Sequence, residues 1–258
     1  MPLPFTARSL DPDAAAFCAR SGASDRAALS AFVRGVKDLG LWDSMVCWPL
    51  RSTQNAGTGT TAYSLGGLGT YNGSLINGPV WGTSGILFDA ASTTHITTQL
   101  DVIGLRKFTV MAATEQRAQV GVADAIMSAW GTATALQYFI LRKTATTLAN
   151  GIVRSGSATR TMQIGGQTDA WRVYGWGTQG ADTVLTASGS QIGSQAFLPD
   201  ETGSQTVNIG IQQPPNNLPY DGTIAWAMLY KDAELTTAQQ LSVYNLYKST
   251  LGTGLGLP

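Results

Sequence analysis

The stretch DRAALSAFVRGVKDLGLWDSMVCWPL, residues 25–50, contains the change of periodicity that decides the fold. Its first half places apolar residues three and four positions apart, the spacing of one helical face. These residues are Leu29, Phe32, Val33, Val36 and Leu39. Its second half has a period of two, because Val46, Trp48 and Leu50 alternate with Cys47 and Pro49. This alternation predicts a half-buried strand, and the proline places it at a sheet edge or a strand end.

A shorter helix is predicted upstream of this stretch. Asp11-Pro12 is typical of an N-cap followed by proline at the first helical position, and Ser21-Gly22 ends that helix. Phe17-Cys18 lies on its inner face. We expect Ser24 to cap the second helix and Gly40 to close it in the left-handed conformation. Residues 10–40 are therefore predicted to form a helical hairpin.

The rest of the chain is expected to be mainly β-structure. Short apolar runs, each bounded by Gly, Ser, Asn, Pro or Asp, follow one another. They lie at residues 85–89, 108–113, 137–141, 151–153, 161–164, 171–176, 183–187, 205–211 and 222–230. Many short strands at this spacing predict an antiparallel sandwich or barrel. A last helix, capped by Thr236 or Thr237, is predicted before the tail GTGLGLP.

Five motifs in the second part of the chain point to a particular sandwich. They are Phe108-Thr109-Val110, Trp171-Arg172-Val173-Tyr174, Val207-Asn208-Ile209-Gly210, Tyr220-Asp221-Gly222-Thr223-Ile224, and Met228-Leu229-Tyr230 followed by Leu235-Thr236. In this order they resemble a LamG-like, or concanavalin A-like, jelly roll across roughly residues 80–248. The resemblance implies a single antiparallel jelly-roll β-sandwich, here preceded by the helical hairpin.

The hairpin carries a motif of its own. Its members are Asp11, Ala14, Phe17, Gly22, Asp25, Leu29, Phe32, Val33, Lys37, Gly40, Leu41 and Trp42. This pattern resembles the hairpin that precedes the same jelly roll in structural proteins of tailed bacteriophages. The resemblance implies a virion component, such as a capsid decoration protein, a head fibre, or a neck or tail appendage. It also implies a homo-oligomer that contacts other capsid, neck or tail subunits.

Three parts are expected along the chain. Residues 1–41 form an extended arm and the helical hairpin, which we expect to anchor the protein to neighbouring subunits. Residues 42–250 form the jelly roll, and residues 251–258 form a C-terminal tail. The opening MPLPFTARSLDPD lacks the continuous apolar segment of a secretory signal. We therefore expect synthesis in the host cytoplasm and residence in the virion.

Charge and cysteine content argue against several classes of partner. The 258-residue chain has 16 Lys and Arg and 16 Asp and Glu, so its formal net charge is zero. Nucleic-acid binding requires a basic excess, so no nucleic-acid partner is expected. No apolar run reaches the ~18 residues that span a bilayer, so no membrane partner is expected. Cys18 and Cys47 are expected to be free, buried thiols in a reducing compartment.

The carboxylates do not suggest a catalytic site. Glycoside hydrolysis needs two carboxylates at a fixed separation, and hydrolases of this fold commonly carry them as E-x-D-x-x-E on one strand. That string is missing, and Glu115, Glu201 and Glu234 are isolated. The adjacent Asp200 and Glu201 would point to opposite sides of a strand. We therefore expect a non-enzymatic protein without catalytic residues, and an atypical glycoside hydrolase is the second alternative.

Metal and cofactor sites are also not expected. His95 is the single histidine, so neither a catalytic triad nor a zinc site is predicted, and we expect it to be exposed or hydrogen-bonded. LamG-like modules sometimes hold Ca²⁺ at the sandwich rim, where Asp89, Asp182 and Asp221 are candidate ligands. Turn formation is the preferred explanation for each of these aspartates.

The seven tryptophans support the first alternative, a module that binds a receptor or surface glycan. An exposed aromatic face packs against the apolar side of a sugar ring. Trp81, Trp130 and Trp176 lie next to glycine and are the candidates for exposure at loops. Trp42 and Trp48 flank the junction of helix and strand, and we expect them to pin the hairpin against the sandwich.

Overall fold

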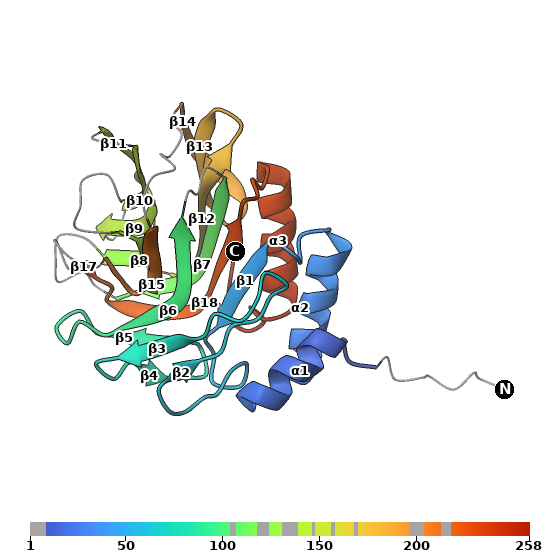
Figure 1. Cartoon of the computed structure of the whole chain (residues 1–258). Helices are drawn as coiled ribbons and strands as arrows, with labels where there is room; N and C mark the ends of the chain where they lie inside the picture. Colours follow the sequence, from blue (N-terminus) through green and yellow to red (C-terminus); the bar gives the residue numbers. More distant parts are fainter. Residues whose placement is uncertain are drawn as a thin grey trace.

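The structure is a computed structural model, and it describes residues 9–103, 107–117, 124–130, 139–145, 148–155, 158–167, 170–196, 204–212 and 218–258. Two antiparallel sheets pack face to face, and three helices cover the outer face of one sheet (Figure 1). The predicted antiparallel sandwich with an N-terminal helical hairpin is confirmed. Within the described residues, no helix is long and apolar enough to cross a membrane.

Sheet A is the sheet that lies under the helices. Its strands run in the order β14 (Ser190–Ala196), β13 (Asp182–Ala187), β12 (Arg172–Gln179), β7 (Phe108–Gln116), β18 (Gly222–Lys231), β5 (Ile86–Phe88) and β4 (Val80–Trp81). β1 (Met45–Pro49) also pairs with β18, opposite residues 226–230. The first and last parts of the chain therefore meet in this sheet.

Sheet B forms the other layer of the sandwich. Its order is β11 (Ala158–Ile164), β10 (Leu148–Ser155), β9 (Phe139–Ala145), β8 (Asp124–Ala129), β15 (Ser204–Ile209), β6 (His95–Ile103), β3 (Gly73–Ile76) and β2 (Thr61–Ala62). A short ribbon of β16 (Ile211–Gln212) and β17 (Leu218–Pro219) follows β15. All of these pairings are antiparallel.

The main core lies between the two sheets. Its largest buried side chains include Trp48, Trp176, Phe88 and Phe108. Gly151 of β10 faces this core, where a Cβ atom would overlap the Trp176 ring. The sandwich therefore uses a glycine inside a strand to admit a large ring from the opposite sheet.

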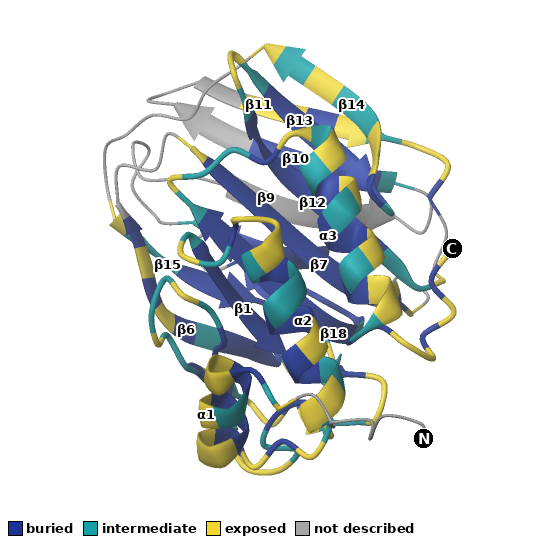
Figure 2. Cartoon of the chain, turned by 90° about the vertical axis from the view of Figure 1, so that its right-hand side faces the viewer, coloured by how far each residue is buried: buried dark blue, intermediate teal, exposed yellow. Residues whose placement is uncertain are grey.

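A second core lies between sheet A and the helices α1 (Pro12–Ser21), α2 (Arg26–Asp38) and α3 (Thr237–Ser249). Figure 2 shows the buried faces of α2 and α3 turned toward the sheet. Leu255 and Leu257 of the tail belong to the same core. Hairpin, sandwich and tail thus share packed side chains, while the proposed boundaries at residues 41 and 250 stay predictions.

The prediction that β1 is half-buried is wrong, because the helices cover the face of β1 that points away from the core between the sheets. All five residues of β1 are buried. Val46 and Trp48 belong to the core between the sheets, whereas Met45 and Cys47 belong to the core under the helices. Pro49 ends the strand, as predicted. Cys18 and Cys47 are free and buried, also as predicted.

Helix ends follow the expected chemistry with one exception. Asp11 caps α1, Gly22 and Gly40 adopt φ values of 76° and 68°, and Thr236 forms a capping box with Gln239. The prediction that Ser24 caps α2 is wrong, because Asp25 occupies the N-cap position. The backbone amides of residues 24 and 25 both donate to the Thr53 carbonyl at 2.9 Å, which holds Ser24 outside the helix.

Candidate functional site

Three neighbouring strands of sheet B present polar side chains on the outer face of the sandwich. Ile209 of β15 pairs with Ile96 and Met127, and all three side chains belong to the inter-sheet core. The adjacent pairs join Asn208 to Thr97 and to Ser128. Because side chains alternate along a strand, these residues face away from the core.

Trp130 extends this polar row. It follows Ser128 by two residues and packs, partly buried, against the cluster of Ala125 and Ile152 on the outer face. Together with Thr97, Gln205, Thr206 and Asn208, it lines an open hollow of about 360 Å³. The hollow thus combines one large aromatic side chain with amide and hydroxyl groups, a combination typical of sites that orient a polar ligand.

Two polar atoms at this hollow lack a hydrogen-bond partner. Asn208 is 4% exposed, and its Nδ2 donates to the Thr206 carbonyl at 3.1 Å, but its Oδ1 accepts no hydrogen bond. The buried Nε1 of Trp130 is unpartnered too. Both atoms are buried from solvent beneath the lining of the hollow. The polar groups that the hollow offers at its surface belong to Thr97, Gln205 and Thr206, which are partly exposed.

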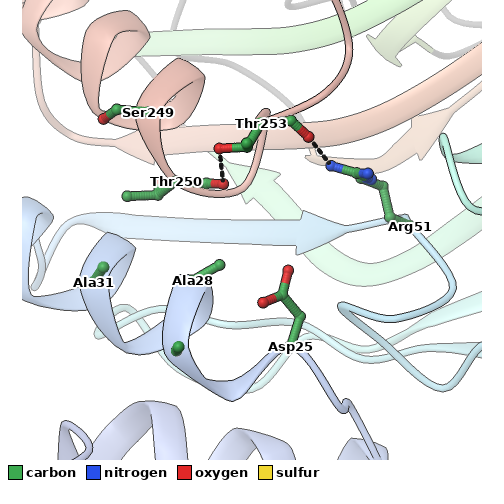
Figure 3. A pocket seen from close by; sticks show the side chains of 8 residues that line it. Asp25, Ala28, Ala31, Arg51, Ser249, Thr250 and Thr253 are labelled. Carbon is green, nitrogen blue, oxygen red and sulfur yellow. Dashed lines mark hydrogen bonds between the residues drawn. The ribbon is translucent and has the colours of Figure 1, made fainter.

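A second hollow, of about 510 Å³, lies between the start of α2 and the end of α3 (Figure 3). Arg51 points toward the C-terminal segment, where its Nη1 donates to the carbonyls of Leu251 and Thr253 at 2.9 Å. Gln54 Nε2 donates to Asp25 Oδ2 at 3.1 Å and to the Leu251 carbonyl at 2.9 Å. These groups fasten the end of the chain to the hairpin, so we assign this hollow a structural role.

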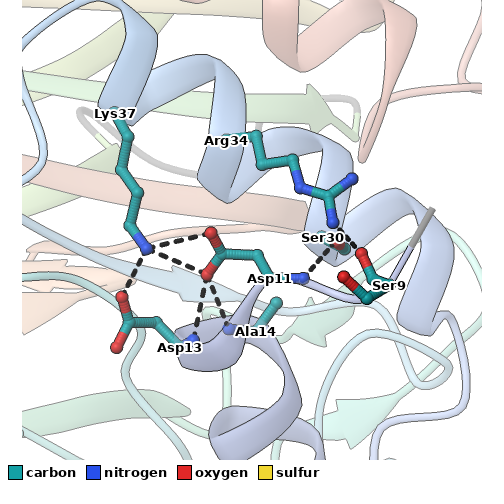
Figure 4. Close-up of polar contacts among 7 residues, drawn as sticks. All are labelled: Ser9, Asp11, Asp13, Ala14, Ser30, Arg34 and Lys37. Atoms are coloured by element: carbon teal, nitrogen blue, oxygen red, sulfur yellow. Dashed lines mark hydrogen bonds and ion pairs between the residues drawn. The ribbon is translucent and has the colours of Figure 1, made fainter.

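A polar network ties the two helices of the hairpin together (Figure 4). Lys37 Nζ contacts Asp11 Oδ2 at 2.9 Å and Asp13 Oδ2 at 2.6 Å. Asp11 Oδ1 also accepts from the Asp13 amide at 2.9 Å, and the Asp11 amide donates to Ser30 Oγ at 2.8 Å. Burial raises the pKa of the Asp11 carboxyl, but the hydrogen bonds from Lys37 and from the backbone outweigh it and hold that pKa below its ordinary value.

Trp42 and Trp48 have different surroundings at the junction of helix and strand. Trp48 is completely buried, and its Nε1 donates to the Tyr71 carbonyl at 2.8 Å. Trp42 packs partly buried against the core under the helices, where a Cβ on Gly67 would lie 2.6 Å from its ring. Trp42 therefore packs where the hairpin meets the sandwich, as expected. The prediction that Trp48 pins the hairpin is wrong, because its side chain belongs to the core between the two sheets. Trp42 also lines a hollow of about 320 Å³ together with Asp13, Arg20 and Asp43, among others.

The three tryptophans that were candidates for exposure at loops, Trp81, Trp130 and Trp176, differ in their burial. The prediction that Trp176 is exposed at a loop is wrong, because it lies within β12, points into the inter-sheet core and is 1% exposed. Trp81 is half-buried, and its Nε1 donates to the Gly59 carbonyl at 3.1 Å. Of these three, Trp130 alone lines a described hollow with unpartnered polar groups.

Glu115 and Glu234 lie too far apart to act as a hydrolytic pair. Glu234 lies 4.0 Å from Lys107, just before β7, whereas Glu115 is exposed near the other end of that strand. The rise of a strand separates these ends by roughly 25 Å, far beyond the separation of roughly 5–10 Å in glycosidases. Asp200 and Glu201 lie outside the described residues.

His95 and the rim aspartate Asp89 both make local hydrogen bonds. His95 is 7% exposed and its Nδ1 lies 2.8 Å from the Thr93 carbonyl, so it is hydrogen-bonded rather than exposed. Asp89 accepts from the Ala91 amide at 3.0 Å and from Ser92 Oγ at 2.8 Å, which confirms its turn-forming role. Burial raises the pKa of Asp221, Arg117 opposes this, and Asp89 adds to it.

Asp89 and Asp221 therefore lie near each other, whereas Asp182 begins β13 in the hairpin after β12. The described residues contain no group of three or more His, Cys, Asp or Glu side chains that could hold a metal ion.

Comparison with known proteins concerns the fold. Neither a protein-family model nor a curated protein sequence matches the chain. The botulinum neurotoxin serotype D binding domain matches with a TM-score of 0.55 at 11% identity, covering 79% of this chain and 52% of that one. The chain thus spans about half of that domain. This likeness confirms the predicted concanavalin A-like, lectin-type jelly roll.

Two further solved structures match at lower TM-scores. The CBM40 module of the Ruminococcus gnavus IT-sialidase, bound to α2,3-sialyllactose, gives 0.47 at 17% identity and covers 55% of this chain and 83% of that one. The SAP-like pentraxin of Limulus polyphemus gives 0.42 at 16% identity, covering 56% and 72%.

Proposed function

We propose that the chain is a non-enzymatic, lectin-like module that binds carbohydrate on the outer face of sheet B. The observation that carries this proposal is the hollow beside Trp130, where the polar side chains of Thr97, Gln205 and Thr206 are partly exposed. An indole face packs against the apolar side of a sugar ring, while the amide and hydroxyl groups bind its hydroxyls.

The arrangement of the two sheets supports this location. The helices cover the outer face of sheet A and bury apolar side chains there. At the level of Asn208, the outward positions of β6, β15 and β8 instead carry threonine, asparagine and serine. A sheet face with partly exposed hydroxyl and amide groups is suited to a hydroxyl-rich ligand.

A glycan array with the full chain tests the proposal. We expect wild-type protein to bind at least one neutral or charged glycan, and Trp130→Leu to weaken that binding more than about tenfold by losing the ring face. Leucine keeps an apolar contact with the cluster of Ala125 and Ile152, which limits the loss of stability. Trp81→Leu is the matched control, because that half-buried indole lies outside the hollow. A folded wild-type protein that binds no glycan would overturn the proposal.

A structural role in a phage particle is a second candidate, supported by the hairpin motif. Ala14, Phe17, Leu29, Phe32 and Val33 of that motif are all buried in the core under the helices. The apolar residues of the motif thus pack against the sandwich of the same chain. Contacts with other virion subunits would be made by the exposed surface of the hairpin. In this setting the protein is a homo-oligomeric virion appendage that contacts capsid, neck or tail subunits and presents the glycan site.

Light scattering and co-sedimentation with phage particles test the second candidate. A defined oligomer that co-sediments with particles supports it. A monomer that stays in the supernatant contradicts it and leaves the glycan-binding proposal to be judged by the array.

A further inference from the structure

We infer that the hollow beside Trp130 selects neutral, hydroxyl-rich saccharides over acidic ones, and that Asp101 is the residue that sets this selectivity. The inference rests on the proposed function, because it concerns the ligand class of the same site. It is carried by the position of the Asp101 carboxylate and by the uncharged lining of the hollow.

Asp101 lies on the outer face of β6, next to the hollow. It pairs with Thr206 of β15, and it is exposed while its neighbour Val102 is buried in the inter-sheet core. Its Oδ1 accepts a hydrogen bond of 2.6 Å from Thr206 Oγ1. Since Thr206 lines the hollow, the carboxylate is hydrogen-bonded to a residue that a bound ligand would contact.

No cation in the described part of the chain forms an ion pair with Asp101. The lining residues that the structure describes are Thr97, Trp130, Gln205, Thr206 and Asn208, none of which is charged. Among the described residues, the carboxylate therefore places a negative charge at the rim of the hollow that no cation pairs with, and solvent and salt screen this charge.

The exposed carboxylate points to the same ligand class. The Asp101 carboxylate can only accept hydrogen bonds, and a sugar hydroxyl can donate one to it. A ligand carboxylate has no proton to donate near neutral pH, and it adds a like charge beside Asp101. At a separation of about 4 Å in water-like surroundings, this repulsion corresponds to roughly fivefold weaker binding.

The test compares a neutral oligosaccharide with its uronic-acid counterpart, in which one hydroxymethyl group is a carboxylate. Dissociation constants are measured by calorimetry for wild type, Asp101→Asn and Asp182→Asn. Asparagine keeps the size of the side chain and an acceptor for Thr206 while removing the charge. Asp182→Asn is the matched control, because that carboxylate belongs to β13 of sheet A.

We expect the wild type and the Asp182→Asn control to prefer the neutral ligand by roughly fivefold at low salt. The preference should approach unity in Asp101→Asn, and should shrink for wild type at about 0.5 M salt. Wild-type protein that binds the acidic ligand equally well or better would overturn the inference while leaving glycan binding intact. An unchanged preference in Asp101→Asn would also overturn it. A folded protein that binds neither saccharide, nor any glycan of the array, would overturn the proposed function itself.

Discussion

The indole ring of Trp226 stacks on the phenol ring of Tyr247, with centroids 4.5 Å apart and planes inclined by 19°. Trp226 lies in β18, the strand that pairs with β1, β5 and β7, and Tyr247 lies in α3. Phe32 of α2 meets the same indole edge-on at 6.0 Å. The indole thus joins the N-terminal hairpin, the sheet and the C-terminal helix in one packed unit.

Phe32→Ala should destabilise the whole protein rather than release the hairpin. The ring is completely buried, and its truncation removes apolar contacts and leaves a cavity beside Trp226. We expect a loss of about 3–5 kcal/mol in the free energy of unfolding, measured by urea denaturation. Ala31→Ser, outside the buried stripe of α2, is the control and should change this free energy by less than about 0.5 kcal/mol. A Phe32→Ala protein as stable as wild type would show that the hairpin is not part of the core.

Asp11→Asn should weaken the protein in a pH-dependent way. The carboxyl has a lowered pKa in the folded state, so its contribution is present above its ordinary value of 3.8 and is lost as pH falls through the folded value. Asparagine retains a capping oxygen but loses the ion pair with Lys37. We expect a deficit of about 1 kcal/mol at neutral pH that disappears in acid, seen in denaturation curves at several pH values. A deficit that stays constant down to the acid limit would contradict this assignment.

Gly151→Ala should disturb the contact between the two sheets. The added methyl group would overlap the Trp176 ring, so the ring or the strand has to shift within the inter-sheet core. We expect a destabilisation of about 1–3 kcal/mol, measured as a lower urea midpoint. Gly165→Ala is a matched control, because its Cβ would meet only Leu148 Cδ2 at 3.7 Å. Equal midpoints for the two variants would mean that the sheets are less tightly packed than described.

Sequence patterns predicted the parts of the fold that depend on local chemistry. The caps at Asp11 and Thr236 and the left-handed glycines at positions 22 and 40 need only neighbouring residues, and each was found where expected. The fully buried β1 was not predicted, because burial of Cys47 depends on helices that pack from elsewhere in the chain. Apolar and polar residues alternate along a strand only when one of its faces is buried and the other is exposed to water. A strand that is buried on both faces shows no such alternation.

Strands β8 and β14 were missed for opposite reasons. All six residues of β8 are buried, so its sequence lacks polar alternation. The residues of β14 are exposed or half-buried, and its Ser and Gln side chains are typical of a loop.

The candidate site was only partly predicted, because its residues come together only in the assembled sheets. A neighbouring glycine made both Trp130 and Trp176 candidates for exposure. Only the assembled sheets show that the Trp130 ring lies on the outer face and the Trp176 ring lies in the core. Asn208 carried no signal, because its role depends on pairing with distant strands.

The most direct measurement for the central claim is an NMR titration of the full chain with a glycan identified by the array. The indole N–H signals report on the seven tryptophans individually once each is assigned by substitution. We predict that the signals of Trp130 and of the Asn208 side-chain amide shift with ligand concentration, while those of the buried Trp48 and Trp226 stay in place. Shifts confined to Trp42, which lines the hollow beside Asp13 and Asp43, would contradict the assignment of the glycan site to sheet B.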